Sequence, residues 1–278
     1  MKAGGAPPLA RLVHVLLGAA PERFVSGTRT LARGSGAIES LVAFAARPLD
    51  GHVLPVRTGP AAGVLLRGDR RSVAWLTGKV ERAVQGALME LLTPGDVFLD
   101  VGAATGFFSV IGGRLVGRTG TVIAFEPEPS RASAIRTNAA LNELSNVTVV
   151  EAAVSDADGS AFLADPASAT AHLVARAPRD ALPVVTVSID AFLEACPTLL
   201  PALVKVDVEG NEQAVLRGME RTLRQGRPTL IVELHGDVAV VGPLEDAGYS
   251  WTPLDGPSLE GVRRGGHLLA TPLEPPAR

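Results

Sequence analysis

The chain has 278 residues, 46% of them hydrophobic and 20% charged, so it can bury the core of one sizeable domain with an appendage or of two small domains. Its 26 basic and 29 acidic residues leave a net charge of −3, and aromatic residues make up only 4%, which argues against nucleic acid and anionic membranes as partners. The one cysteine, Cys196, excludes an internal disulfide and fits a cytoplasmic location.

The first 77 residues give the weakest signal. The stretch RLVHVLLGAAPERF, residues 11–24, resembles a weak signal peptide, but its apolar run is short and His14 interrupts it, so we predict an amphipathic helix. No stretch reaches the roughly 18–20 uninterrupted apolar residues that a membrane span requires. Residues 51–78 look like short strands joined by glycine-containing turns. We expect residues 1–77 to form an irregular region that helps to cover a substrate, and residues 78–278 to form the main domain.

From residue 81 the pattern becomes regular. Apolar residues at helical spacing predict a helix over 81–92, and strands then alternate with helices. The predicted strands cover 96–102, 121–127, 146–154, 201–210 and 227–236, and the predicted helices cover 105–116, 129–144 and 211–226. Extra strands interrupt the alternation between residues 155 and 200, and a helix and two strands close the chain. This alternation predicts an α/β fold whose mostly parallel sheet carries helices on both faces.

The stretch FLDVGAATG, residues 98–106, joins the first of these strands to its helix and contains glycines where a ligand would lie. Nicotinamide enzymes use G-x-G-x-x-G there, but this chain lacks the middle glycine. Asp100 would repel a pyrophosphate and attract an ammonium group, so the loop favours S-adenosylmethionine over NAD. We predict that Asp100 and the loop residues Gly102, Ala104, Thr105 and Gly106 bind this cofactor. A plain strand-to-helix turn is the structural alternative.

Two further segments extend the predicted nucleoside site. Glu126 ends the second strand, where a carboxylate can accept hydrogen bonds from both ribose hydroxyls. The third strand ends in EAAVSD, where adenine would lie, so Ala153 would form a flat wall and Asp156 could accept from the adenine amine. Asp156 could equally cap the following turn.

The fourth strand ends in a group of charged residues, LVKVDVEGNE, which is costly to bury unless the charges are paired or functional. Strand alternation places Lys205, Asp207 and Glu209 on one side. The candidates for a general base are Asp207, Glu209, Glu233 and His235, and the last of these could also be a surface or structural histidine. Lys205 is expected to neutralise its neighbours.

The sequence gives only weak evidence on the roles of the remaining histidines and on metal binding. No acidic motif surrounds His52, His172 or His267, so we predict that none is catalytic. Several acids near one strand end could hold a divalent cation through oxygen ligands. Their spacing is not diagnostic, so no metal ligand is assigned.

Five segments in register resemble the FkbM family of S-adenosylmethionine-dependent methyltransferases. They are FLDVGAATGFFS, GTVIAFEPEPS, NVTVVEAAVSD, LVKVDVEGNEQAVLRGM and PTLIVELHG, and TGKVE just upstream resembles the family's G-x-x-E segment. The resemblance covers about residues 78–236. It implies a class I, Rossmann-like methyltransferase fold with a seven-stranded sheet, and usually O-methylation of a hydroxyl on a natural product, glycoside or lipid.

The resemblance also implies roles for individual residues. Asp100, Gly102 and Gly106 would line the methionine end of the cofactor, Glu126 the ribose, and Asp207 the site of methyl transfer. The chain departs from the family's common G-A-N-x-G, because Ala104 and Thr105 supply no side-chain amide. Two alternatives stay open: an NAD(P)-dependent oxidoreductase and a non-catalytic nucleotide-binding protein. The acceptor is expected to be a small molecule, and the oligomeric state cannot be read from the sequence.

Overall fold

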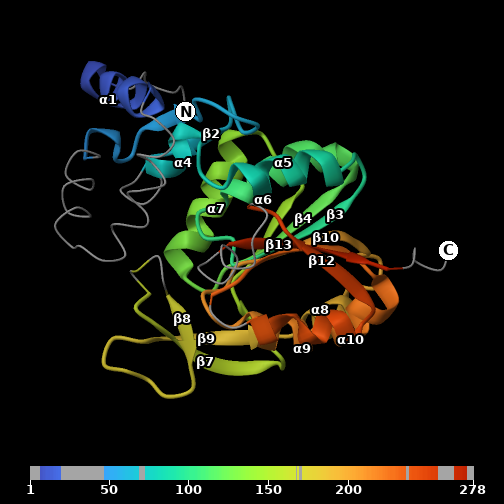
Figure 1. Ribbon diagram of the computed structural model, residues 1–278. Coiled ribbons are helices and arrows are strands. Elements are labelled where there is room, and N and C mark those ends of the chain that lie inside the picture. The colour runs from blue at the N-terminus through green and yellow to red at the C-terminus, as the bar shows by residue number, and fades with distance from the viewer. Residues whose placement is uncertain are drawn as a thin grey trace.

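The computed structural model describes residues 7–19, 47–68, 73–166, 168, 171–235, 238–255 and 266–273. Within these residues the strands form sheets of seven, four and two strands, and the large sheet lies between two layers of helices (Figure 1). The strands of the large sheet are β3 (Val97–Val101), β4 (Thr121–Phe125), β5 (Val147–Val150), β10 (Pro201–Val206), β11 (Thr229–Glu233), β12 (Tyr249–Pro253) and β13 (His267–Pro272). The predicted α/β fold with a seven-stranded sheet is confirmed.

The order of strands in the large sheet is β12-β13-β11-β10-β3-β4-β5. Five strands pair in parallel, and β13 runs antiparallel between β11 and β12. After β5 the chain returns to the other side of β3 to form β10, so the strand order reverses between β3 and β10. Open α/β sheets bind ligands outside the carboxyl ends of their strands at such a reversal.

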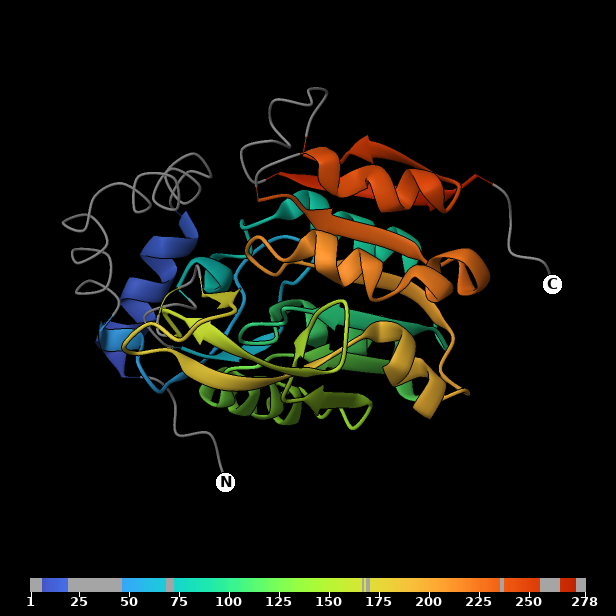
Figure 2. The same ribbon diagram turned by 90° about the horizontal axis from the view of Figure 1, so that it is seen from below.

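The helices cover both faces of this sheet (Figures 1 and 2). One layer contains α5 (Arg82–Leu91), α6 (Phe107–Val116) and α7 (Pro129–Leu141), and the other contains α8 (Ile189–Ala195), α9 (Glu212–Arg217) and α10 (Gly242–Asp246). Side chains alternate along a strand, so Phe98 packs in the first layer and Leu99 in the second. The strands are apolar on both faces because both faces are covered.

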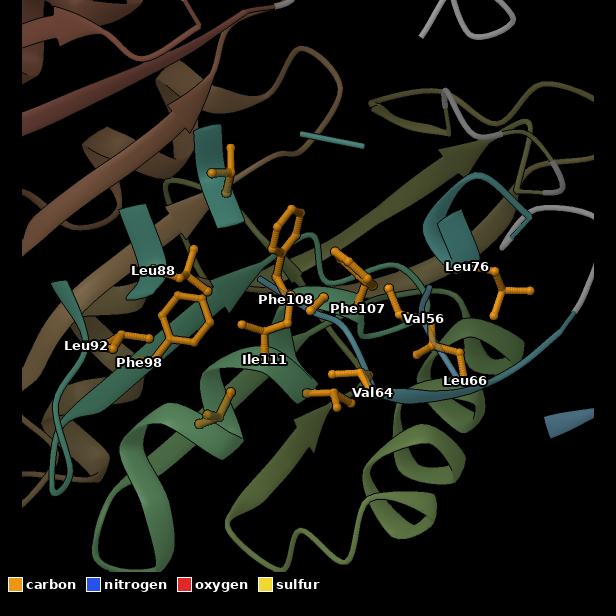
Figure 3. Packing of buried hydrophobic residues seen from close by; sticks show 14 of the residues in the cluster. Val56, Val64, Leu66, Leu76, Leu88, Leu92, Phe98, Phe107, Phe108 and Ile111 are labelled. Atoms are coloured by element: carbon orange, nitrogen blue, oxygen red, sulfur yellow. The ribbon is translucent and has the colours of Figure 1, made fainter. Parts of the chain in front are cut away.

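The described part of the N-terminal region packs on the first layer. It contains α1 (Pro8–Ala19), a 3₁₀ turn η1 (Arg47–Leu49), a hairpin of β1 (Val53–Pro55) and β2 (Leu65–Arg67), and α4 (Val73–Thr77). Val56, Val64, Leu66 and Leu76 share a core with Phe98, Phe107 and Phe108 (Figure 3). Residues 73–77, predicted to lie in a strand, are helical, and Trp75 from this helix stacks on Phe107 with ring centroids 4.7 Å apart.

The helix predicted near the N-terminus is confirmed as α1, although its exposure runs against the amphipathic pattern. Its buried face carries Ala10 and His14, whereas the exposed residues include Leu9, Leu12 and Leu16. Residues 20–24 of the predicted helix lie outside the described residues. Among the described helices, none is long and apolar enough to cross a membrane.

Two other predicted elements are split. The strand predicted over 146–154 ends at Val150, and Ala153–Val154 form β6 in the four-stranded sheet with β7 (Gly159–Ala164), β8 (His172–Val174) and β9 (Leu182–Val187). The helix predicted over 211–226 breaks after Arg217 and resumes as a π-helical turn, η3 (Thr222–Gly226). Gly218 stands at the break, where a β-carbon would lie 2.0 Å from the Ser155 carbonyl oxygen.

Candidate active site

The candidate site lies where β3, β4, β10 and β11 end side by side. Asp100 precedes the last residue of β3, Glu126 and Asp207 directly follow β4 and β10, and Glu233 is the last residue of β11. Lys205 pairs with Asp100 across the β10–β3 register. The structure therefore brings the predicted charged residues to one edge of the sheet, at the reversal of strand order.

The two glycines of the β3–α6 loop are required by the protein's own packing. Gly102 has a φ of +81°, and a β-carbon there would lie 1.8 Å from the carbonyl oxygen of Asp207. Gly106 has a φ of +83°, and a β-carbon there would lie 2.9 Å from the Ile135 side chain. The glycines thus let the loop approach the end of β10 and α7 closely, which joins the predicted cofactor loop to the predicted transfer site.

Ala104, between these glycines, has a φ of 49°, a left-handed conformation that is strained for alanine. Its backbone N–H donates to Oε2 of Glu126 at 2.9 Å. The next carbonyl, of Thr105, accepts from Nδ2 of Asn138 at 2.8 Å, and Oδ1 of Asn138 accepts from the Arg67 N–H at 2.9 Å. The buried Asn138 on α7 therefore ties the loop to the N-terminal hairpin, a link that the sequence analysis missed.

Glu126 is buried, and each of its carboxylate oxygens accepts one backbone N–H. Burial raises the pKa of Glu126 to about 7, although Arg131 and the two N–H donors oppose the rise. Each carboxylate oxygen has about two acceptor positions, so both oxygens can accept one more hydrogen bond. Two neighbouring hydroxyl groups are the ligand that such a carboxylate fits.

Asp100 is also buried, and its Oδ2 accepts from the Ser109 hydroxyl at 2.5 Å. Its Oδ1 has no hydrogen-bond partner among the described residues. Burial raises the pKa of Asp100, although Lys205 and Ser109 oppose the rise. An unpartnered buried carboxylate oxygen fits a cationic hydrogen-bond donor such as an ammonium group.

Lys205 and Asp207 form an ion pair at the end of β10. Nζ of Lys205 lies 2.9 Å from Oδ2 of Asp207 and 4.9 Å from the centre of the Phe108 ring. Burial works to lower the pKa of Lys205, but the carboxylates of Asp207, Asp100 and Glu81 raise it above its usual value. Burial also raises the pKa of Asp207 to about 7 against the opposing effect of Lys205.

His235 follows β11 and is surrounded by carboxylates. Its Nδ1 lies 2.8 Å from Oε1 of Glu212, and its Nε2 lies 3.2 Å from Oε2 of Glu209 and 3.5 Å from Oε1 of Glu233. Burial works to lower the pKa of His235, but these acids raise it to about 10. Glu209 has a φ of 53°, a second strained residue of the site.

The two residues predicted to contact adenine make local contacts in the described structure. Ala153 is buried against Leu163 and Val184 of the four-stranded sheet. Asp156 is exposed, and its Oδ1 accepts from the Ser155 hydroxyl at 3.3 Å. Their adenine roles stay predictions.

A second group of charged residues, which was not predicted from the sequence, lies beside the first. His267, predicted to be non-catalytic, pairs with Glu233 in the antiparallel β11–β13 register. Its Nε2 lies 3.5 Å from Oε2 of Glu233 and 3.5 Å from Oε2 of Glu81, and its Nδ1 lies 2.6 Å from Oδ2 of Asp255. The only hint of this group in the sequence is the G-x-x-E segment that ends at Glu81. The residues that Glu81 approaches, Glu233 and His267, lie more than 150 residues later in the sequence.

Comparison with known proteins identifies similar sequences and folds. A sequence profile described as the methyltransferase FkbM domain matches residues 100–249. The hexuronic acid methyltransferase AglP of Haloferax volcanii is 30% identical over 159 residues, which cover 57% of this chain and 64% of AglP. The match therefore spans less than two thirds of that relative.

Two solved structures illustrate the structural similarity. The methyltransferase FkbM of Methylobacillus flagellatus KT is 16% identical with a TM-score of 0.43, over 73% of this chain and 55% of that chain. Fibrillarin of Aeropyrum pernix, solved with natively bound S-adenosyl-L-methionine, is 15% identical with a TM-score of 0.40, over 65% of this chain and 68% of that chain.

Proposed function

The chain belongs to the FkbM family and is an S-adenosylmethionine-dependent methyltransferase, and from this premise we propose that it methylates a hydroxyl group of a small sugar-containing molecule. The observation that carries the proposal is the convergence of Asp100, Glu126 and Asp207 at the ends of three adjacent strands. Family membership assigns S-adenosylmethionine as the cofactor in place of NAD(P)H.

Two features of the described site fit this cofactor. Oδ1 of Asp100 is buried and has no hydrogen-bond partner among the described residues, so it can accept from the ammonium group. Both oxygens of Glu126 keep acceptor capacity for the two ribose hydroxyls. Gly102, Ala104, Thr105 and Gly106 hold this loop beside both carboxylates. The bound cofactor supplies an activated methyl group, and the protein's contribution is to bind, orient and deprotonate.

Asp207 is the general base in this proposal. It directly follows β10, its side chain is 21% exposed, and Lys205 holds one of its oxygens at 2.9 Å. The other oxygen can face the acceptor hydroxyl, and a pKa of about 7 suits a base at neutral pH. His235 is less suited, because both of its ring nitrogens face carboxylates. It orients Glu209 and Glu233 at the acceptor side.

The negative charge of the site limits the kinds of acceptor molecule that it can bind. The name of AglP refers to a hexuronic acid, which supports a sugar as the acceptor here. In this chain Asp207, Glu209, Glu212 and Glu233 gather around one lysine and one histidine. Like charges this close cost free energy, so a neutral hydroxyl-bearing ring fits the site better than a uronate.

Calorimetry with S-adenosylhomocysteine and NADH, followed by methyl transfer to a panel of neutral glycosides and uronates, tests this function. We expect the protein to bind S-adenosylhomocysteine but not NADH. We expect it to methylate neutral glycosides in preference to uronates. The variant Asp207→Asn should lose turnover and keep cofactor affinity, and His235→Ala should lower turnover more than cofactor binding. Binding of NADH would overturn the proposal, and cofactor binding without turnover on any acceptor would favour the non-catalytic alternative.

A further inference from the structure

We propose that Glu81, Glu233 and His267 bind a divalent transition-metal ion beside the methyl-transfer site. Their donor atoms come from three distant parts of the chain: the residue before α5, the end of β11 and the start of β13. One donor atom from each residue lies within 4.8 Å of the donor atoms of the other two. The three side chains are 7%, 8% and 3% exposed.

The distances within this group suit metal ligands better than an ion pair. Nε2 of His267 lies 3.5 Å from each carboxylate oxygen. A charge-assisted N–H···O hydrogen bond is about 2.7–2.9 Å long, so both contacts are too long. Ligands at about 2.0–2.1 Å from a tetrahedral ion stand roughly 3.4 Å apart, which is close to the spacing observed.

An independent observation comes from the histidine itself. His267 is buried, and its Nε2 has no hydrogen-bond partner among the described residues. A protonated imidazole there would leave a buried donor unsatisfied, and a neutral one would direct a lone pair at two carboxylates. A metal ion between the three atoms gives Nε2 of His267 a partner and accepts the charge of the two carboxylates.

The other nitrogen of His267 is arranged as in many metal sites. Its Nδ1 lies 2.6 Å from Oδ2 of Asp255, which also accepts the backbone N–H of His267 at 2.8 Å. Histidine ligands almost always donate their second ring N–H to a carboxylate or carbonyl, which leaves the first nitrogen to the metal. Asp255 is thus the positioning residue, and it fixes the tautomer that Nε2 needs.

The ligand set indicates the class of ion. Imidazole suits zinc and other transition metals, whereas carboxylates alone would suit magnesium or calcium. One histidine and two glutamates therefore point to Zn²⁺ or Mn²⁺. Three protein ligands leave positions open. Resting on the proposed function, we assign these positions to oxygens of the acceptor, because Oε1 of Glu233 also lies 3.5 Å from His235 in the acceptor site.

The test begins with metal binding by the full chain after chelator treatment. Zn²⁺ and Mn²⁺ are titrated separately by calorimetry, and the stoichiometry is checked by elemental analysis. We expect one ion per chain with at least one of the metals. The variant Asp255→Asn should weaken binding by about 10- to 100-fold, and Glu81→Gln and His267→Gln by more. The control Glu212→Gln removes a buried carboxylate from neighbouring His235 and should leave metal affinity unchanged.

Two further measurements keep the outcome decisive. Each variant is checked for folding by its affinity for S-adenosylhomocysteine, and metal-induced shifts of the histidine NMR signals report coordination at Nε2 without any activity assay. The absence of binding at one ion per chain, or equal affinity in wild type and Glu81→Gln, overturns the metal site. Cofactor affinity is measured on the same chelator-treated protein. Cofactor binding without metal binding would exclude the metal site alone, and metal binding without cofactor binding would exclude the proposed function alone.

Discussion

Replacing Lys205 by methionine tests the electrostatic design of the site. Lys205 is 1% exposed, its ammonium group pairs with Asp207 at 2.9 Å, and Asp100 lies opposite it in the sheet register. Methionine has a similar length and packs well against the neighbouring Phe108 ring, so the substitution removes the charge with little change in volume. Both carboxylates would then be buried without their cation.

The expected cost follows from the burial of the pair. Removing one partner of a buried ion pair typically destabilises a protein by about 3–5 kcal/mol, because the other charge stays buried and unpaired. With an unfolding entropy of about 2.1 cal/mol/K per residue, this chain should lose roughly 5–9 °C in Tm. The measurement belongs at pH 8, where Asp207 of the wild type, with a pKa of about 7 beside Lys205, is ionised. The loss of Lys205 raises this pKa further, and any protonation of Asp207 in the variant moves the cost toward the lower end of the range.

Thermal unfolding with Arg224→Met as the matched control separates this effect from a general loss of charge. Arg224 pairs with Glu220 on the surface, where both side chains are more than half exposed, so its loss should cost at most about 1 kcal/mol. The double variant Lys205→Met with Asp207→Asn should recover part of the loss, because the two residues are coupled. Equal Tm values for the Lys205 and Arg224 variants would refute the claim that Lys205 compensates buried negative charge. Asp100 and Asp207 would then be neutral or hydrated in the Lys205 variant.

Three further predictions concern the cofactor site. Ala104→Asn should stabilise the protein by about 1 kcal/mol in thermal unfolding, because asparagine adopts the left-handed conformation more readily, whereas the same change at the exposed helical residue Ala140 should destabilise it. The affinity for S-adenosylhomocysteine should fall by up to about tenfold per pH unit below pH 7. The reason is that Glu126, whose pKa is raised to about 7, must lose its proton to accept hydrogen bonds from both ribose hydroxyls. Calorimetry at several pH values should show this dependence in the wild type and a constant affinity in the Glu126→Gln variant. Asp100→Asn should weaken S-adenosylmethionine binding by about 1.5–3 kcal/mol, and unchanged affinity would exclude its predicted role.

The parts of the fold that depend on local spacing could be predicted from the sequence. The loop after β3, Glu126 after β4 and Asp207 after β10 each end a short apolar run, so strand-helix alternation alone places them at one edge. The break in the helix predicted over 211–226 could not be predicted from the sequence of that segment. At the break, Gly218 lies so close to Ser155, more than 60 residues earlier, that a β-carbon would lie 2.0 Å from the Ser155 carbonyl oxygen.

Contacts that depend on antiparallel pairing could not be predicted at all. His267 meets Glu233 only because β13 inserts between β11 and β12, and nothing near His267 in sequence is a conventional metal motif. Glu81 joins them through a left-handed backbone conformation with a φ of 47°, which its residue type does not suggest. Such strain is tolerated where the surrounding structure holds it, and it is found most often at functional sites.

The charges of the site connect the cofactor and the proposed metal ion. The protein buries Asp100, Glu126 and Glu233 within its strand ends. Burying carboxylates costs free energy, which Lys205 offsets only in part at Asp100 and Arg131 only in part at Glu126, as the raised pKa values of these two acids indicate. A cationic cofactor on one side and a divalent ion on the other would each reduce this cost, so each should stabilise the folded chain. Raised Tm on adding either ligand alone, and a further rise on adding both, is the behaviour that this arrangement of charges predicts.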